Sequence, residues 1–137
     1  MLAIGIDLGT TNSAIAQLDH HGKPIVIPNE LGESITPSVI CFEPGQTSFG
    51  APAKELQSLG SYPVAVFFKR QMGDEYFLFH VDGVDYTAVD LSAMLLKKLV
   101  EDAQSRLGQN INDVVITVPA YFKDPERQAT IAAGKAA

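Results

Sequence analysis

The chain of 137 residues is 46% hydrophobic and carries 16 acidic against 10 basic residues, for a formal net charge of −6. This length fits one domain or one lobe of a larger protein, and the composition is that of a folded chain rather than a disordered one. The acidic balance argues against a nucleic-acid partner, which would need clustered Lys and Arg. No secretory signal is visible, and no apolar run approaches the roughly 18 residues of a membrane span. We therefore expect a cytoplasmic protein with neither a membrane nor a nucleic-acid partner.

The first 50 residues predict a series of short strands. Apolar runs at 2–6, 13–18, 24–28 and 37–42 alternate with turns that carry Gly, Asp, Asn or Pro. The three short connections between these runs favour an antiparallel meander. Cys41 is the only cysteine, which excludes an internal disulfide, and its apolar surroundings indicate a core residue.

The next part of the chain predicts two helices and a hairpin. Residues 51–59 form a short helix candidate, and the apolar segment 64–73 is also expected to be helical, with its final glycine as the stop. Residues 76–87 predict a β-hairpin in which Asp82 and Gly83 form the turn.

The histidines do not predict a metal or catalytic site. His20 and His21 are adjacent in a turn, without a third ligand nearby, and we interpret them as solvated. His80 is interpreted as a packed strand residue, since no carboxylate or nucleophile is an obvious partner for it in the sequence.

The clearest helix begins after Thr87, which forms a capping box with Asp90. Gly108 is a natural stop for this helix. One face of it repeats an apolar residue every four positions, at Leu91, Leu95, Leu99, Ala103 and Leu107.

The last 25 residues predict a strand and a helix. Residues 113–119 are continuously apolar, as in a strand buried on both faces. Asp124, followed by Pro and Glu, is expected to cap a helix that is still running at Ala137. Because no terminating signal follows, we expect the chain to be the front part of a longer protein.

The stretch GIDLGTTNS, residues 5–13, combines the features of a phosphate site. Asp7 ends an apolar strand and is followed by Gly9, Thr10 and Thr11. Such a turn gathers backbone N–H groups in one concavity, the glycine permits positive φ and close approach of a ligand, and the threonines add hydroxyl donors. A carboxylate beside phosphates acts through a divalent cation, and Mg²⁺ keeps most of its waters. This interpretation makes Asp7 a water-mediated anchor for a metal-bound nucleotide.

A plain turn is the competing interpretation of the same stretch. Asp7 would then cap the turn through an Asx hydrogen bond. The stretch is neither a Walker P-loop nor a dinucleotide fingerprint. Spacing alone leaves both interpretations open.

Four segments, in one order, carry a resemblance to a known family. They are IGIDLGTTNSAIA, NELGESITPSVICF, VAVFFKRQMG and DVVITVPAYFKDPERQATIAAGKAA. Together they resemble the opening third of the ATPase domain of the heat shock protein 70 chaperones of DnaK type. The wider superfamily, which includes actin and the sugar kinases, shares the strand–phosphate-loop–strand device, whereas VPAYFKDPERQAT is typical of the chaperones.

The resemblance implies a role for each matching residue. Asp7 would hold Mg²⁺ through water, and the phosphates of ATP or ADP would be cradled by Gly9, Thr10, Thr11 and Asn12. Lys69 matches the catalytic lysine, which orients the attacking water and the γ-phosphate, as suits a reaction helped by positioning and charge neutralisation.

Pro119 and Arg127 match the relay that couples nucleotide state to the substrate-binding domain. Without the resemblance, these two would be a strand end and an exposed helical residue, and Lys69 a solvated cation at a helix end.

Two features depart from the family pattern. The segment at 74–90 is short, as in the HscC-like branch with a reduced second subdomain, which puts partner contacts through that subdomain in doubt. In addition, no D-x-G-G-G-T-like second phosphate loop occurs in the chain.

The expected fold is therefore α/β: lobe I of an actin-like ATPase (ribonuclease H-like), with a mixed sheet, flanking helices and a small inserted subdomain. Residues 1–37 and 88–137 would form the first part of subdomain IA, and 38–87 a reduced subdomain IB, with the rest of the ATPase domain and the substrate-binding domain absent. This chain alone is expected to have little or no ATPase activity, and an apolar edge that the absent parts would cover favours self-association.

The expected function is that of an ATP-dependent chaperone that captures and releases unfolded polypeptide. By resemblance, its partners would be unfolded clients, a J-domain co-chaperone and a nucleotide exchange factor, and its cofactors ATP or ADP and Mg²⁺. A small-molecule (sugar) kinase of the same superfamily and a non-hydrolysing nucleotide-binding paralogue are the alternatives.

Overall fold

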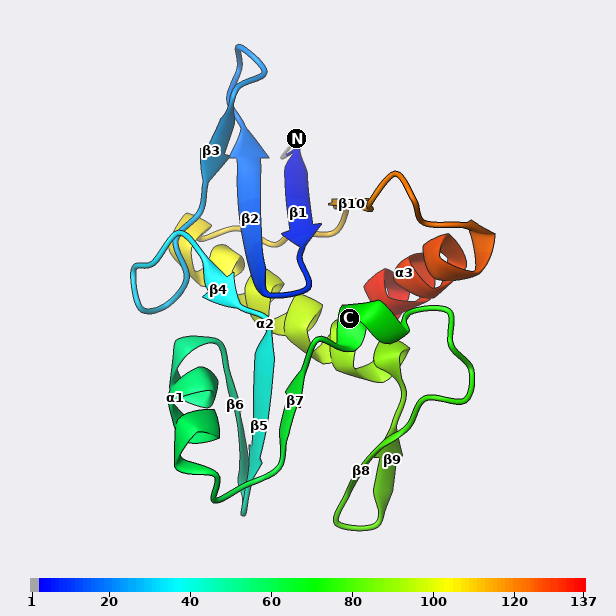
Figure 1. Cartoon of the computed structure of the whole chain (residues 1–137). Coiled ribbons are helices and arrows are strands. Elements are labelled where there is room, and N and C mark those ends of the chain that lie inside the picture. Colours follow the sequence, from blue (N-terminus) through cyan, green and yellow to red (C-terminus); the bar gives the residue numbers. More distant parts are fainter. Residues whose placement is uncertain (1–2) are drawn as a thin grey trace.

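The computed structural model describes residues 3–137, which form a larger mixed sheet, a smaller sheet and flanking helices (Figure 1). The larger sheet has the order β10-β1-β2-β3, and β4 also pairs with β2. β10 is parallel to β1, whereas the other pairs are antiparallel. Its strands are β1 (Ile4–Leu8), β2 (Asn12–Leu18), β3 (Pro24–Val26), β4 (Thr36–Pro37) and β10 (Val115–Thr117).

The smaller sheet lies below the larger one in Figure 1 and has the order β6-β5-β7. A separate hairpin follows it along the chain. These elements are β5 (Val39–Glu43), β6 (Gln46–Phe49), α1 (Ala51–Leu59), β7 (Val64–Val66), the 3₁₀ helix η1 (Phe68–Gln71), β8 (Phe79–Val81) and β9 (Val84–Tyr86).

One hydrophobic core joins the two sheets through α2 (Ala88–Leu107). Alternate residues of β1 point into this core, namely Ile4, Ile6 and Leu8. The predicted apolar stripe of α2 is buried except at its end, where Leu107 is half-buried, and α2 also packs against α3 (Asp124–Ala136). Burial of the stripe explains why an amphipathic pattern of period near four forms a helix here.

The central strand of the smaller sheet, β5, is buried on both faces. Ile40 and Phe42 of β5 belong to the main core, whereas Val39 and Cys41 form a second cluster with Ala53 of α1. Cys41 is fully buried, which confirms its interpretation as a core residue. Burial, with a smaller contribution from the charge of Glu43, raises the pKa of its thiol.

Several local signals are confirmed. The Thr87–Asp90 capping box is present, with Asp90 N–H donating to Thr87 Oγ1 at 3.0 Å and Thr87 N–H to Asp90 Oδ2 at 2.9 Å. Gly108 ends α2 in the left-handed conformation. His20 and His21 are exposed in the turn between β2 and β3, as predicted.

Residues 64–73 do not form one continuous helix: only Phe68–Gln71 is helical, as a 3₁₀ turn. They form β7 and η1, separated by Phe67, whose φ of 56° lies in the left-handed region. Pairing of Val64 and Val66 with β5 explains the difference, because a sheet partner overrides the weak helical preference of a short apolar run. The predicted meander likewise ends at β3, since β5 leaves for the smaller sheet.

Three further predictions are wrong in detail. Residues 113–119 do not form a strand buried on both faces: β10 is an edge strand and Val115 is 70% exposed. His80 is not packed, since it is exposed and its Nδ1 lies 2.5 Å from Asp85 Oδ1 across the hairpin. The N-cap of α3 is Lys123 rather than Asp124.

Over the described residues, no helix is both long and apolar enough to span a membrane.

Candidate phosphate-binding site

Asp7 lies on the exposed face of the larger sheet. It pairs with Ala14 of β2 on one side and Thr117 of β10 on the other. Its neighbours Ile6 and Leu8 point into the core, so strand alternation directs Asp7 to the opposite face. The carboxylate at the end of this apolar strand is therefore exposed, which avoids the cost of burying a charge.

The turn between β1 and β2 follows directly. A Cβ atom at Gly9 would lie 2.0 Å from the carbonyl oxygen of Asn12, so only glycine fits. The prediction that Gly9 is needed for a positive φ is wrong, because Gly9 is not among the glycines with positive φ. Glycine is required here because the chain itself, at Asn12, approaches too closely for a side chain. Thr11 and Asn12 are exposed and Thr10 is half-buried, which leaves the polar groups of the turn accessible.

A residue not predicted from the sequence, Ser38, fastens this turn. Its hydroxyl lies 2.8 Å from the Gly9 carbonyl oxygen and 2.8 Å from Ser13 Oγ. Its backbone N–H donates to the Thr11 carbonyl oxygen at 2.8 Å. The signal in the sequence was a small polar residue immediately before the apolar run 39–42.

Lys69 is carried into the same neighbourhood by η1. Burial lowers the pKa of its ammonium group, and the nearby Asp7 carboxylate partly opposes this shift. Its Nζ also lies 5.8 Å from the ring centroid of Phe122. The left-handed Phe67 sets the direction in which η1 starts, and the Arg70 guanidinium stacks 4.8 Å from its ring centroid. The charges of Asp7 and Lys69 therefore act on each other, while the roles of both residues at a nucleotide site stay predictions.

A pocket of about 340 Å³ adjoins Lys69. It lies between η1 and the segment that leads into α3, and its lining includes Arg70, Phe122 and Glu126. Gly73 packs closely here, since a Cβ atom at this position would lie 3.2 Å from Glu126 Cγ. The Lys69 segment and the start of α3 therefore form one surface.

Pro119 and Arg127 flank this surface. The Pro119 carbonyl oxygen accepts the Phe122 N–H at 3.0 Å, and the Arg127 N–H donates to the Lys123 carbonyl oxygen at 3.0 Å. The Arg127 side chain is exposed on the first turns of α3. Their coupling role stays a prediction.

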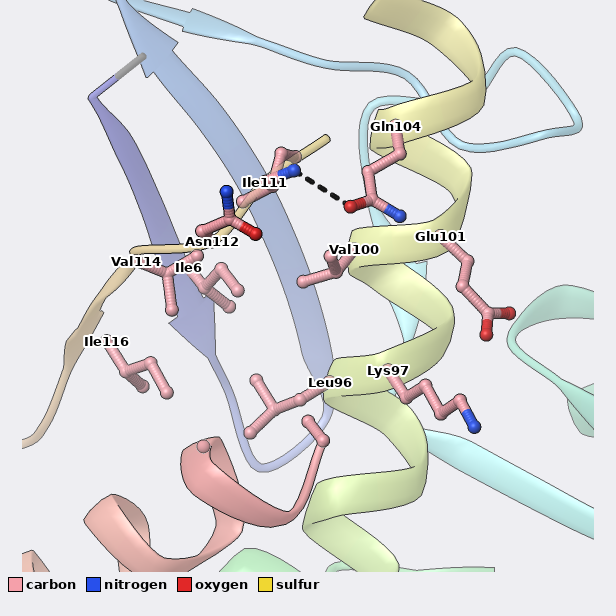
Figure 2. A pocket seen from close by; sticks show the side chains of 12 residues that line it. Ile6, Leu96, Lys97, Val100, Glu101, Gln104, Ile111, Asn112, Val114 and Ile116 are labelled. Carbon is pink, nitrogen blue, oxygen red and sulfur yellow. Dashed lines mark hydrogen bonds between the residues drawn. The ribbon is translucent and has the colours of Figure 1, made fainter. Parts of the chain in front are cut away.

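A second pocket, of about 270 Å³, lies on the core side of β1 (Figure 2). Its floor is apolar and includes Ile6, Leu96 and Val100, and at its rim Gln104 Oε1 accepts the Ile111 N–H at 2.8 Å. None of the predicted phosphate-site residues lines it. Ile6 faces this pocket, and successive side chains of a strand point to opposite faces of the sheet. The pocket and Asp7 therefore lie on opposite faces of the larger sheet.

The residues present fit a water-mediated magnesium ion rather than a directly ligated metal. In residues 3–137 no group of three or more His, Cys, Asp or Glu side chains could hold a metal. Mg²⁺ needs only one or two carboxylates when phosphate oxygens and waters complete its shell. An exposed Asp7 just before a turn that carries the exposed Thr11 and Asn12 fits that donor set.

The mixed sheet, its inserted smaller sheet and the Gly-Thr-Thr turn beside Asp7 place the chain among the actin-like ATPases, as the first lobe of that fold. A protein-family model described as Hsp70 protein matches residues 3–82 and 77–137. The chain therefore belongs to the Hsp70 family. At family level this means ATP-dependent chaperones that hydrolyse ATP, bind ATP or ADP with Mg²⁺, and work with unfolded clients and co-chaperones. Membership also favours a chaperone over a sugar kinase.

Proposed function

We propose that this chain is the phosphate-binding lobe of the ATPase domain of a DnaK-type chaperone. The observation that carries the proposal is the exposed Asp7 carboxylate just before the closely packed Gly9–Asn12 turn. Asp7 would hold the hydrated Mg²⁺, and the phosphates would be bound by Gly9, Thr10, Thr11 and Asn12. Mg²⁺ would neutralise phosphate charge.

Lys69 has the properties of a positioning cation for the γ-phosphate. Its ammonium group is half-buried, and a partly desolvated charge acts more strongly on a phosphate than a solvated one. Pro119, just after β10, and Arg127, in the first turn of α3, would pass the state of this site to a substrate-binding domain.

We further propose that the protein belongs to the HscC-like branch. The segment between η1 and α2 contains only a small hairpin, and the two stretches matched to the family overlap within it, at residues 77–82. Residues 38–87 would then be a reduced subdomain IB, and 1–37 with 88–137 the first part of subdomain IA. The partners would be unfolded polypeptide, a J-domain protein and a nucleotide exchange factor. A cytoplasmic location suits a chain whose single thiol is buried and free.

Calorimetric titration of this chain with Mg-ATP tests the site directly. Binding should be lost in Asp7→Ala and retained in Asp113→Ala, a matched removal of one carboxylate from an exposed position. Equal binding by both variants would remove Asp7 from the site. Absence of binding to the unchanged chain would contradict a preformed phosphate site in this lobe.

Replacement of Lys69 tests the catalytic assignment in a protein that carries the complete ATPase domain. Lys69→Ala should abolish single-turnover hydrolysis and spare Mg-ATP binding. Unchanged hydrolysis would exclude a catalytic role for Lys69, and a parent protein that binds but never hydrolyses ATP would instead favour the non-hydrolysing paralogue.

A further inference from the structure

We propose that Ser38 is a positioning residue that holds the phosphate turn in its binding conformation before nucleotide arrives. The inference deepens the proposed function and rests on it. Ser38 is the one side chain that bonds directly to the turn backbone between β1 and β2 among the residues described. It lies between β4 and β5, at the point where the chain passes from the larger sheet to the smaller one.

The direction of each hydrogen bond follows from counting protons. The Gly9 carbonyl oxygen can only accept, so the single Ser38 hydroxyl proton is donated to it. The bond between the two serine hydroxyls must then be donated by Ser13 to Ser38. Ser13 and Ser38 are 1% and 3% exposed, so water does not compete for these bonds.

These bonds orient the binding groups of the turn. Ser38 donates hydrogen bonds to two carbonyl oxygens of the turn: its hydroxyl to that of Gly9 and its N–H to that of Thr11. In a trans peptide the C=O and N–H point in opposite directions. Fixing these two carbonyls therefore directs the N–H groups of Thr10 and Asn12 away from Ser38. A turn with its N–H groups already aligned loses less entropy on binding a phosphate.

Ser38 is itself held from both sides. Thr36, two residues earlier, accepts a hydrogen bond from Asn29 Nδ2 at 3.0 Å and pairs with Ser13 in the sheet. On the other side, the Gly50 N–H donates to the Val39 carbonyl oxygen at 3.0 Å, which ties the position to the smaller sheet. A displacement of the smaller sheet relative to the larger one would thus act on the phosphate turn through Ser38.

The test measures backbone order in this chain without nucleotide, by NMR relaxation. In Ser38→Ala the order parameters of Gly9–Asn12 should fall from about 0.85 to below about 0.6, while those of α2 stay unchanged. Ser58→Ala is the matched control, because it removes an exposed serine hydroxyl that bonds only to Glu55 in α1. Ser13→Ala leaves the Ser38–Gly9 bond intact and should lower turn order less than Ser38→Ala does.

Unchanged order at Gly9–Asn12 in Ser38→Ala would overturn the proposal, as would an equal loss across α2, which would mean general destabilisation. Should Ser38→Ala not fold, Ser38→Cys keeps nearly the same volume with a weak donor, and the same comparison applies. Mg-ATP titration separates the two levels of inference. If Ser38→Ala loses turn order but the unchanged chain binds no Mg-ATP, the role of Ser38 stands and the proposed function of the lobe is refuted. If the unchanged chain binds Mg-ATP, Ser38→Ala should weaken its affinity about tenfold, and Ser58→Ala should leave the affinity unchanged.

Discussion

Two half-buried lysines, Lys69 and Lys98, lie in contrasting surroundings. Lys98 Nζ is 3.0 Å from Glu30 Oε1 and 3.0 Å from Asp102 Oδ1. Burial alone would lower the pKa of Lys98, but the hydrogen bonds and charges of Asp102 and Glu30 outweigh it, and the pKa is raised. Burial also lowers the pKa of Lys69, and there the Asp7 charge offsets only part of the effect.

The difference separates a region that stabilises the fold from one that binds. Around Lys98 the charges are paired, and Arg106 Nη2 adds a bond to the Asn29 carbonyl oxygen at 2.7 Å, so the segment after β3 is fastened to α2. The Lys69 ammonium group lies near the ring of Phe122 and is affected by the charge of Asp7, with which it forms no direct bond. Uncompensated charge of this kind costs stability and is typical of functional sites.

The largest expected effect is at the phosphate turn. Gly9→Ala should lower the free energy of unfolding by at least about 3 kcal/mol, because the new Cβ would overlap the Asn12 carbonyl oxygen and the backbone must move. Gly5→Ala, on the strand that leads into the turn, is the control: its nearest contact is at 3.9 Å, and it should change stability by less than about 1 kcal/mol. Urea denaturation of both variants checks this. Equal stabilities would mean that the turn is easily deformed.

Replacing each lysine by methionine sharpens the comparison itself. Lys98→Met should destabilise the chain by about 1–2 kcal/mol, because the Asp102 side chain, only 10% exposed, loses its partner. Lys69→Met keeps the apolar stem and removes a penalised charge, so its stability should stay equal or rise by about 0.5 kcal/mol. Thermal and urea unfolding at neutral pH measure both. Destabilisation of the same size at the two positions would refute the contrast.

Features set by local chemistry were predictable from the sequence. The capping box of Thr87, the stop at Gly108 and the turn after Asp7 depend on residues within a few positions of one another. The order of the four motifs added the actin-like fold, which no spacing argument could supply.

Features set by tertiary contact were not predictable. Ser38 contacts the turn from the junction between β4 and β5, more than 25 residues further along the chain. β7 forms because β5 lies beside it. The apolar residues of β10 predict a buried strand, yet among the described residues β10 pairs only with β1, and its other edge is open. Apolar content indicates burial in general and does not say which face or edge is covered.

The left-handed Phe67 gives the third prediction. A β-branched residue tolerates positive φ poorly, whereas Asn tolerates it well. Phe67→Asn should therefore be more stable than Phe67→Val by about 1 kcal/mol, although valine is the more hydrophobic, since both lose the contact with Arg70 alike. Denaturant unfolding of the pair decides. Greater stability of the valine variant would show that η1 starts in another conformation.

The smallest effect concerns pH. The Lys69 pKa in the folded chain lies below its ordinary value of 10.5, so between those two values the unfolded chain binds more protons and stability rises with pH. At pH values below the folded-state pKa of Lys69, the cost of burying its charge lowers stability in full. Lys98 has the opposite sign: its raised pKa gives a stabilisation that is complete below 10.5 and is lost as pH rises further.

An NMR titration of the lysine Cε resonances therefore should show Lys69 losing its proton before Lys98. Asp7→Asn removes the carboxylate whose charge supports that of Lys69, so it should lower the Lys69 midpoint further and leave Lys98 unmoved. Asp102→Asn should do the reverse, lowering the Lys98 midpoint alone. A Lys69 midpoint that ignores Asp7 would mean that the two charges do not sense each other. The phosphate turn would then lack the cation that its proposed chemistry requires, whatever the fold of the lobe.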